Sequence, residues 1–195
     1  MTVTIYGFAP STFVRTARMA CLEKGVSHEL KPLEFREESH MRLHPFARMP
    51  VMSCDDVVLF ETLAITCFID EVFEGPLLRP PAHTDRCRML QWISAASDYL
   101  YGNLVAGALD DRDAFSNRET EIRRIVAPFD AALAEARYFA GNAISLADLF
   151  AAPIIDFALS CPGGADLLSP FDHLARWRSE LMRRESFIAT ASEAA

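Results

Sequence analysis

The sequence lacks the features that mark several large classes of protein. It has no Cys-x-x-Cys pair and no paired spacing of cysteine and histidine, which argues against a zinc module. Its five cysteines cannot all pair within the chain, so reduced thiols are expected. No apolar run approaches the length of a membrane span, and the chain does not open with a basic segment, an apolar run and a cleavage site. We therefore expect a cytoplasmic protein.

Positive charge and hydrolase motifs are also scarce. Only 19 Lys and Arg stand against 27 Asp and Glu, and the formal net charge of −8 argues against nucleic acid or an anionic membrane as the main partner. No Gly-x-Ser-x-Gly motif supports a Ser-His-Asp hydrolase. What is present is a chain of 195 residues, 51% hydrophobic and 24% charged, which suits one large domain or two small ones. Such a chain requires no metal and no disulfide scaffold.

Residues 1–75 alternate between strand and helix patterns. The segment "TVTIYGF" predicts a strand that breaks at Gly7, and a helical stripe of Val14, Ala17 and Cys21 follows. The segment "SHELKPLE" predicts a second strand, parallel to the first, and a linking helix comes after it. The runs "VMSC" and "VVLF" predict an antiparallel hairpin before another helix. The expected order is βαβ-α-ββα, in the α/β class.

The second part of the chain has only helical patterns. The segment "EGPLLRPPA" holds one Gly and three prolines and predicts a linker at 76–82, and an all-α domain is expected at 83–195. Two helix starts carry the spacing of a capping box, at Ser116–Glu119 and at Ser145–Asp148. These signals concern helix initiation and carry no information on function.

The first candidate for chemistry is the hydroxyl of Ser11. It stands in a loop between a predicted strand and a predicted helix, where free amides and the positive end of the helix dipole favour an anion. The alternative is a plain helix cap, since serine is among the preferred caps. Thr12 is the reserve candidate, because the register of this loop can shift by a residue.

The second candidate is the stretch "HPFARMPVMSCDDVVLFETLAI". If the bond between Met49 and Pro50 is cis, the backbone of Met49 is turned outward and can pair with an extended peptide. Glu61 and Thr62 stand where the next helix begins and offer a carboxylate, a hydroxyl and free amides to an α-amino-acid head group. The alternative is a buried turn followed by an ordinary acidic first turn.

Four segments together carry a family resemblance. "YGFAPSTFVRTARMACLEKG", "HPFARMPVM", "LFETLAI" and "ISLADLF" resemble, in order and spacing, the cytosolic glutathione S-transferases, and among them serine-type bacterial members of the phi or theta kind. The resemblance implies a thioredoxin-like N-terminal domain that binds glutathione, the proline linker, and an all-helical domain that binds the second substrate. It also implies a homodimer.

The resemblance assigns roles to the candidate residues. Met49 beside cis Pro50 would pair with the cysteinyl part of glutathione, and Glu61 and Thr62 would receive the γ-glutamyl group. Arg48, and with less support His40 or Arg42, would face the glycyl carboxylate. Ser11 would donate a hydrogen bond to the glutathione sulfur and so favour the thiolate. The residues expected to contact the hydrophobic substrate are Phe13, Tyr99 and Tyr101.

Three functions remain open at this stage. The first is conjugation of glutathione to small hydrophobic electrophiles. The second is a non-catalytic interaction module, because His44, Ala47, Arg48 and Met49 replace the residues that the family usually carries there, and Thr62 replaces its serine. The third is a glutathione-dependent isomerase or reductase, which shares the thiolate step. Residues 1–20 contain no cysteine, which argues against members that form mixed disulfides with glutathione.

Overall fold

The computed structural model describes residues 1–111 and 113–191, which form two compact units. The first unit holds Met1–Leu78 together with the segment that begins at Arg184, and the second holds Arg79–Arg183. The helical pattern of the sequence places this last segment in the predicted helical domain. The contacts instead join it to the first unit, because helix α11 (Glu185–Thr190) packs on helix α1 (Thr12–Glu23). No local pattern in the sequence encodes such a contact.

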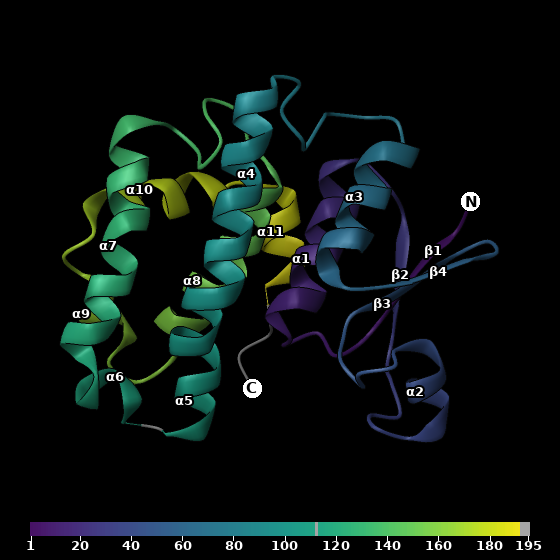
Figure 1. Ribbon diagram of the computed structural model, residues 1–195, viewed down its shortest axis with the longest axis horizontal. Coiled ribbons are helices and arrows are strands. Elements are labelled where there is room, and N and C mark those ends of the chain that lie inside the picture. Colours follow the sequence, from purple (N-terminus) through teal and green to yellow (C-terminus); the bar gives the residue numbers. More distant parts are fainter. Residues whose placement is uncertain (112, 192–195) are drawn as a thin grey trace. The chain divides into compact units, whose positions relative to one another are not determined.

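The first unit is a mixed four-stranded sheet with helices packed against it (Figure 1). The sheet order is β2-β1-β3-β4, with β1 parallel to β2 and antiparallel to β3. This arrangement confirms the thioredoxin-like βαβ-α-ββα prediction. Besides α1 and α11, the elements are β1 (Val3–Tyr6), β2 (His28–Lys31), α2 (Glu38–Leu43), β3 (Val51–Cys54), β4 (Val57–Phe60) and α3 (Thr62–Val72).

The core of the first unit lies between the sheet and the helices α1 and α3, which pack against each other. The predicted stripe of Val14, Ala17 and Cys21 is completely buried. Ile65 and Ile69 are one turn apart on α3 and are also completely buried. Helical spacing in the sequence therefore identified the face of α1 that builds this core.

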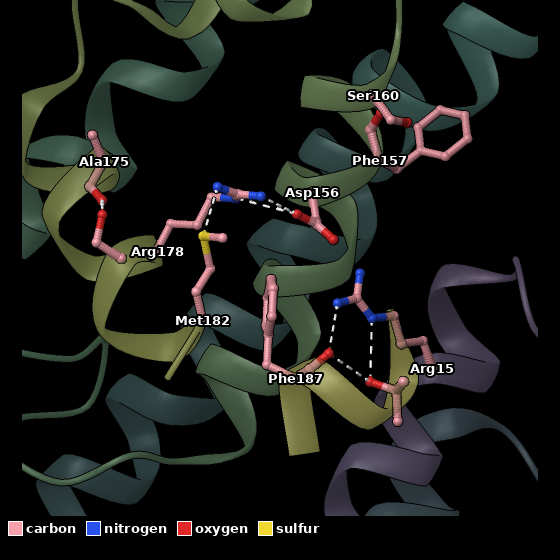
Figure 2. A network of polar contacts seen from close by, with 10 residues as sticks. Arg15, Asp156, Phe157, Ser160, Ala175, Arg178, Met182 and Phe187 are labelled. Carbon is pink, nitrogen blue, oxygen red and sulfur yellow. Dashed lines mark hydrogen bonds and ion pairs between the residues drawn. The ribbon is translucent and has the colours of Figure 1, made fainter. Parts of the chain in front are cut away.

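Helix α11 is fixed onto α1 by two sets of polar contacts. The buried Arg15 donates from Nη2 to the carbonyl of Phe187 at 3.2 Å and from Nε to Thr190 Oγ1 at 3.3 Å (Figure 2). At the other end of α1, the carboxylate of Glu23 accepts from Arg184 Nε at 2.7 Å. The position of α1 in the first unit thus depends on residues more than 150 positions away in the chain.

The regular elements that the structure describes in the second unit are all helices, and Tyr138 and Gly141 form an isolated antiparallel bridge. Its elements are α4 (His83–Ala95), η1 (Ala96–Ala106), α5 (Gly107–Asp110), α6 (Ala114–Asn117), α7 (Glu119–Glu135), α8 (Leu146–Ser160), α9 (Gly164–Leu168) and α10 (Asp172–Leu181). The element η1 is a π-helix, although the sequence predicts one regular helix from 83 to 108. A side-chain pattern does not distinguish the two hydrogen-bond registers.

One of the two predicted capping boxes is present. Ser145 and Asp148 form the box at the start of α8. The box predicted at Ser116–Glu119 is wrong, because Ser116 lies inside the short helix α6 and α7 begins only at Glu119. The extra helical turn before α7 removes Ser116 from the capping position.

Asp148 is also the centre of the core of the second unit. Its carboxylate is completely buried and accepts hydrogen bonds from the indole Nε1 of Trp177 at 2.8 Å and from the amide of Phe139 at 3.2 Å. Phe139 in turn packs on Trp92 and Trp177, with ring centroids 5.4 and 5.2 Å away. Burial raises the pKa of Asp148, and the surrounding hydrogen-bond donors oppose that shift.

A second polar cluster of this unit joins α8 and α10. The guanidinium of Arg178 donates to the carboxylate of Asp156 and, at 3.0 Å, to Met182 Sδ (Figure 2).

Among the described residues, no helix is long and apolar enough to cross a membrane. The same residues hold no group of three or more His, Cys, Asp and Glu that is arranged to bind a metal ion.

Candidate functional site

Strand register in the first unit brings four loops to one edge of the sheet. Tyr6, the last residue of β1, lies opposite Lys31 of β2 and Val51 of β3, and Val51 lies opposite Phe60 of β4. The chain therefore enters or leaves each of these strands at the same edge. The loops at this edge and the first turns of the helices that follow them hold the candidate residues of the first unit: Ser11, Thr12, Phe13, His40, Arg48, Met49, Pro50, Glu61 and Thr62.

Gly7 allows two of these loops to approach closely. A Cβ atom at Gly7 would lie 2.4 Å from Val14 Cγ2 and 3.5 Å from Met49 Cβ. A residue with a side chain would overlap the side chain of Val14 at the start of α1, whereas its distance to Met49 would be an ordinary contact. The break that the sequence shows after the first strand is thus a requirement of close approach.

Ser11 is the N-cap residue of α1. Its backbone is extended, with φ −66° and ψ 125°, and its Oγ accepts from the amide of Val14 at 3.5 Å. The hydroxyl proton is not used by this contact, so a capping serine can still donate to a ligand. Thr12 is only 5% exposed, and its Oγ1 has no hydrogen-bond partner among the described residues. The more accessible hydroxyl is therefore that of Ser11.

The peptide bond between Met49 and Pro50 is cis, the geometry that the family resemblance implies. Strand β3 begins at Val51, so Met49 lies outside the hydrogen-bonded ladder. Its side chain is partly exposed, whereas Pro50 is buried. An extended peptide laid along this edge would meet the backbone of Met49 in the manner of an added strand.

Glu61 and Thr62 form the start of α3. Glu61 is the N-cap residue, with φ 69° and ψ 121°, a conformation that residues other than glycine rarely adopt. Its side chain makes no cap hydrogen bond and is 64% exposed, so the carboxylate is presented to solvent. Thr62, the first residue of the helix, is buried, with only 8% of its surface exposed. Backbone strain of this kind clusters at binding sites.

His40 has a different place from the one that the sequence suggests. It is 1% exposed, its Nδ1 accepts from the amide of Arg36 at 3.1 Å, and its Nε2 donates to the carbonyl of Arg48 at 2.8 Å. The ring therefore ties together the backbones of two exposed arginines and is itself shielded from a ligand. The sequence does not identify Arg36 as a candidate residue, because only the two hydrogen bonds of His40 bring it near Arg48. Arg42 is paired with Glu38 at 2.5 Å.

Two cysteines of the first unit, Cys21 and Cys54, are buried and are not reactive groups of this site. Burial raises the pKa of Cys21 to about 12 and also raises the pKa of Cys54. A thiol with a raised pKa is a poor nucleophile at neutral pH, since the thiolate is the reactive form. Neither of these two thiols therefore supplies a nucleophilic sulfur at this edge.

The remaining predicted residues lie on helices. Phe13 is half-buried on α1 of the first unit. Tyr99 and Tyr101 lie on the π-helix of the second unit, where Tyr99 is 59% exposed and its carbonyl accepts from Asn103 Nδ2 at 2.7 Å. Their role as substrate contacts stays a prediction.

Comparison with known proteins agrees with this architecture. Residues 1–71 match the family model "Glutathione S-transferase, N-terminal domain", and residues 93–185 match "Glutathione S-transferase, C-terminal domain". Glutathione S-transferase F10 of Arabidopsis thaliana is 27% identical over 207 residues, which cover 96% of this chain and 95% of that protein. Glutathione S-transferase 4 of Zea mays is 28% identical and covers 93% of this chain and 88% of its own length.

A solved structure shows the same fold. A glutathione S-transferase from Methylobacillus flagellatus, with glutathione bound, superposes with a TM-score of 0.85 at 20% identity and covers 97% of this chain and 98% of that one. Both domain models match in the order and at the positions where the two compact units lie. The chain belongs to the cytosolic glutathione S-transferase family.

Proposed function

We propose that the protein is a glutathione transferase of the serine type, which joins the glutathione thiolate to small hydrophobic electrophiles. The observation that carries the proposal is the convergence of Ser11, the cis Met49–Pro50 bond and the Glu61 carboxylate at one edge of the sheet. Membership of the family supports it.

Each part of the tripeptide has a matching group at this edge. The cysteinyl backbone pairs with Met49, and the γ-glutamyl ammonium and carboxylate meet the Glu61 carboxylate and the hydroxyl and amide of Thr62. The glycyl carboxylate meets the two arginines that His40 ties together, Arg36 and Arg48. A guanidinium suits this role because its planar donors match a carboxylate.

Ser11 supplies the chemistry by stabilising an anion. A free thiol has a pKa of about 8.5, so only about 7% of it is thiolate at pH 7.4. A hydrogen bond from the Ser11 hydroxyl and the amides at the start of α1 favour the charged form, and a shift of about one to two units makes the thiolate a major species. The thiol proton passes to solvent. The sulfur then bonds to the electrophilic carbon, and the leaving group departs with its electron pair.

The proposal also covers the second substrate, the cellular location and the oligomeric state of the protein. Phe13, Tyr99 and Tyr101 contact the hydrophobic electrophile, and the helical domain selects among conjugation, isomerisation and reduction by the electrophile that it admits. We also propose a cytoplasmic homodimer of bacterial type, in which residues 1–75 bind glutathione, residues 76–82 form the linker, and the second substrate binds in the helical part that begins at residue 83.

Calorimetry with glutathione and a conjugation assay with 1-chloro-2,4-dinitrobenzene test the proposal. We expect binding at millimolar or lower concentration. Ser11→Ala should lower kcat at least tenfold while the dissociation constant of glutathione changes less than threefold. Thr12→Val is the matched control and should keep kcat within threefold. Absence of binding at 10 mM glutathione would refute the proposal.

The replacements around Met49 favour one rival, a module that keeps the fold without catalysis. Arg48 and Met49 preserve the backbone groups of the site, but a longer side chain at Met49 alters its surface. The ultraviolet absorbance of bound thiolate separates the two functions. An enzyme should show the absorbance when glutathione binds, and a module should not.

A further inference from the structure

A buried histidine lies beside the carboxylate that the proposed function assigns to the γ-glutamyl group. His44 follows helix α2, and its side chain is 2% exposed. Its ring packs on Phe60 with centroids 4.9 Å apart and on Phe46 with centroids 6.2 Å apart. The aromatic neighbours hold the imidazole in one orientation.

The hydrogen bonds of His44 determine which ring nitrogen carries the proton. The amide of Phe46 donates to Nδ1 at 3.3 Å, so Nδ1 is an acceptor and the proton of the neutral ring is on Nε2. Nε2 lies 4.0 Å from Glu61 Oε1. The N–H of a neutral His44 therefore faces the Glu61 carboxylate.

Charged and titratable groups face His44 from three elements. They are Glu61 at the start of α3, His40 of α2, whose ring centroid is 6.3 Å away, and Arg48 of the following loop. Burial lowers the pKa of His44 from its ordinary value of 6.5, the Glu61 carboxylate opposes this, and His40 and Arg48 add to it. The ring is accordingly neutral at pH 7.5.

We propose that His44 is a positioning residue for Glu61, and that protonation of His44 sets the acid limit of γ-glutamyl binding. The inference rests on the proposed function. The neutral ring places its Nε2–H dipole 4.0 Å from the carboxylate of the strained Glu61, beyond hydrogen-bond distance, and so positions this carboxylate electrostatically. A protonated ring can no longer accept the Phe46 amide at Nδ1, and it places a cation beside Glu61 that competes with the ammonium of the ligand.

The experiment measures the dissociation constant of S-methylglutathione by calorimetry between pH 5.5 and 7.5. This probe has no thiol, so titration of the sulfur and of the Ser11 site does not contribute. The variant His44→Gln keeps an amide donor near the position of Nε2 but does not titrate. The variant His44→Asn keeps only a group near Nδ1. His173→Gln, at an exposed position of α10, is the control.

For the natural protein and His173→Gln we expect the dissociation constant to rise from pH 7.5 to pH 5.5 by up to about fivefold, the limit set by about 1 kcal/mol for two unit charges 4 Å apart in water. His44→Gln should show less than a twofold change over this range. His44→Asn should bind more weakly than His44→Gln at pH 7.5, because nothing orients Glu61.

Two results would overturn the inference while leaving the proposed function intact. One is an acid rise that persists in His44→Gln, and the other is equal affinity of His44→Gln and His44→Asn at pH 7.5. If folded natural protein binds no S-methylglutathione at pH 7.5, the proposed function fails and the inference fails with it. Far-ultraviolet circular dichroism at each pH confirms that the variants are folded.

Discussion

Replacement of Asp148 by asparagine tests the energetic centre of the second unit. Asp148 Oδ1 accepts from Trp177 and Phe139, and Oδ2 accepts from the amide and the hydroxyl of Ser145, both at 2.9 Å. Asparagine keeps one oxygen and replaces the other with a donor. If the oxygen stays with Trp177 and Phe139, the Ser145 amide faces an NH₂ group and loses its acceptor.

The expected loss follows from the groups left without partners. One buried donor without an acceptor costs about 1–3 kcal/mol, so Asp148→Asn should lower the free energy of unfolding by about that amount. Burial imposes a desolvation cost on the charged carboxylate, and the neutral asparagine does not have this cost. The loss of unfolding free energy should therefore lie toward the lower end of this range. Asp148→Ala leaves three amide or indole donors unpaired and costs about 3–9 kcal/mol, which is comparable to the whole stability of a domain.

The assay is urea unfolding followed by tryptophan fluorescence. Both tryptophans, Trp92 and Trp177, lie in the second unit, so the signal reports on that unit. Asp172→Asn, at an exposed first-turn position of α10, is the control and should cost less than about 1 kcal/mol. If Asp148→Asn were as stable as the natural protein, desolvation of the carboxylate would outweigh its hydrogen bonds and the reasoning would be wrong.

Two further predictions concern the first unit. Gly7→Ala should raise the dissociation constant of glutathione and lower the urea midpoint, because the new Cβ meets Val14 at 2.4 Å; unchanged values in both measurements would contradict the close-approach argument. Stability should fall as pH drops below about 6.5, since burial lowers the pKa of His28 and His44 and the unfolded chain then binds more protons than the folded one. Urea midpoints at pH 7.5 and 5.5 check this, and a variant with Gln at both histidines should lose most of the difference.

The fold of the first unit was largely predictable, because its signals are local. Strand alternation before Gly7, the buried stripe from Val14 to Cys21 and the hairpin around Asp55 each occupy a few residues. The π-helix at Ala96–Ala106 was not, since apolar spacing fits both helical registers. The attachment of α11 to α1 depends on Arg15 and Phe187, which no sequence window contains together.

Some residues of the candidate site were likewise predictable from local motifs, and others were not. Ser11, Met49, Pro50 and Glu61 follow from motifs that resemble a family, and the structure brings their loops to one edge of the sheet. The bridging role of His40 could not be predicted. It requires hydrogen bonds to the backbones before and after helix α2, and such bonds leave no mark in residue type or spacing.

Titration of the thiol of bound glutathione tests the central claim most directly. The claim is that the Ser11 hydroxyl at the start of α1 stabilises the thiolate, and ultraviolet absorbance of the bound tripeptide against pH measures it. The natural protein should give a thiol pKa about one to two units below the free value of about 8.5, and Ser11→Ala should return it to within half a unit of that value. An equally low pKa in Ser11→Ala would contradict the account.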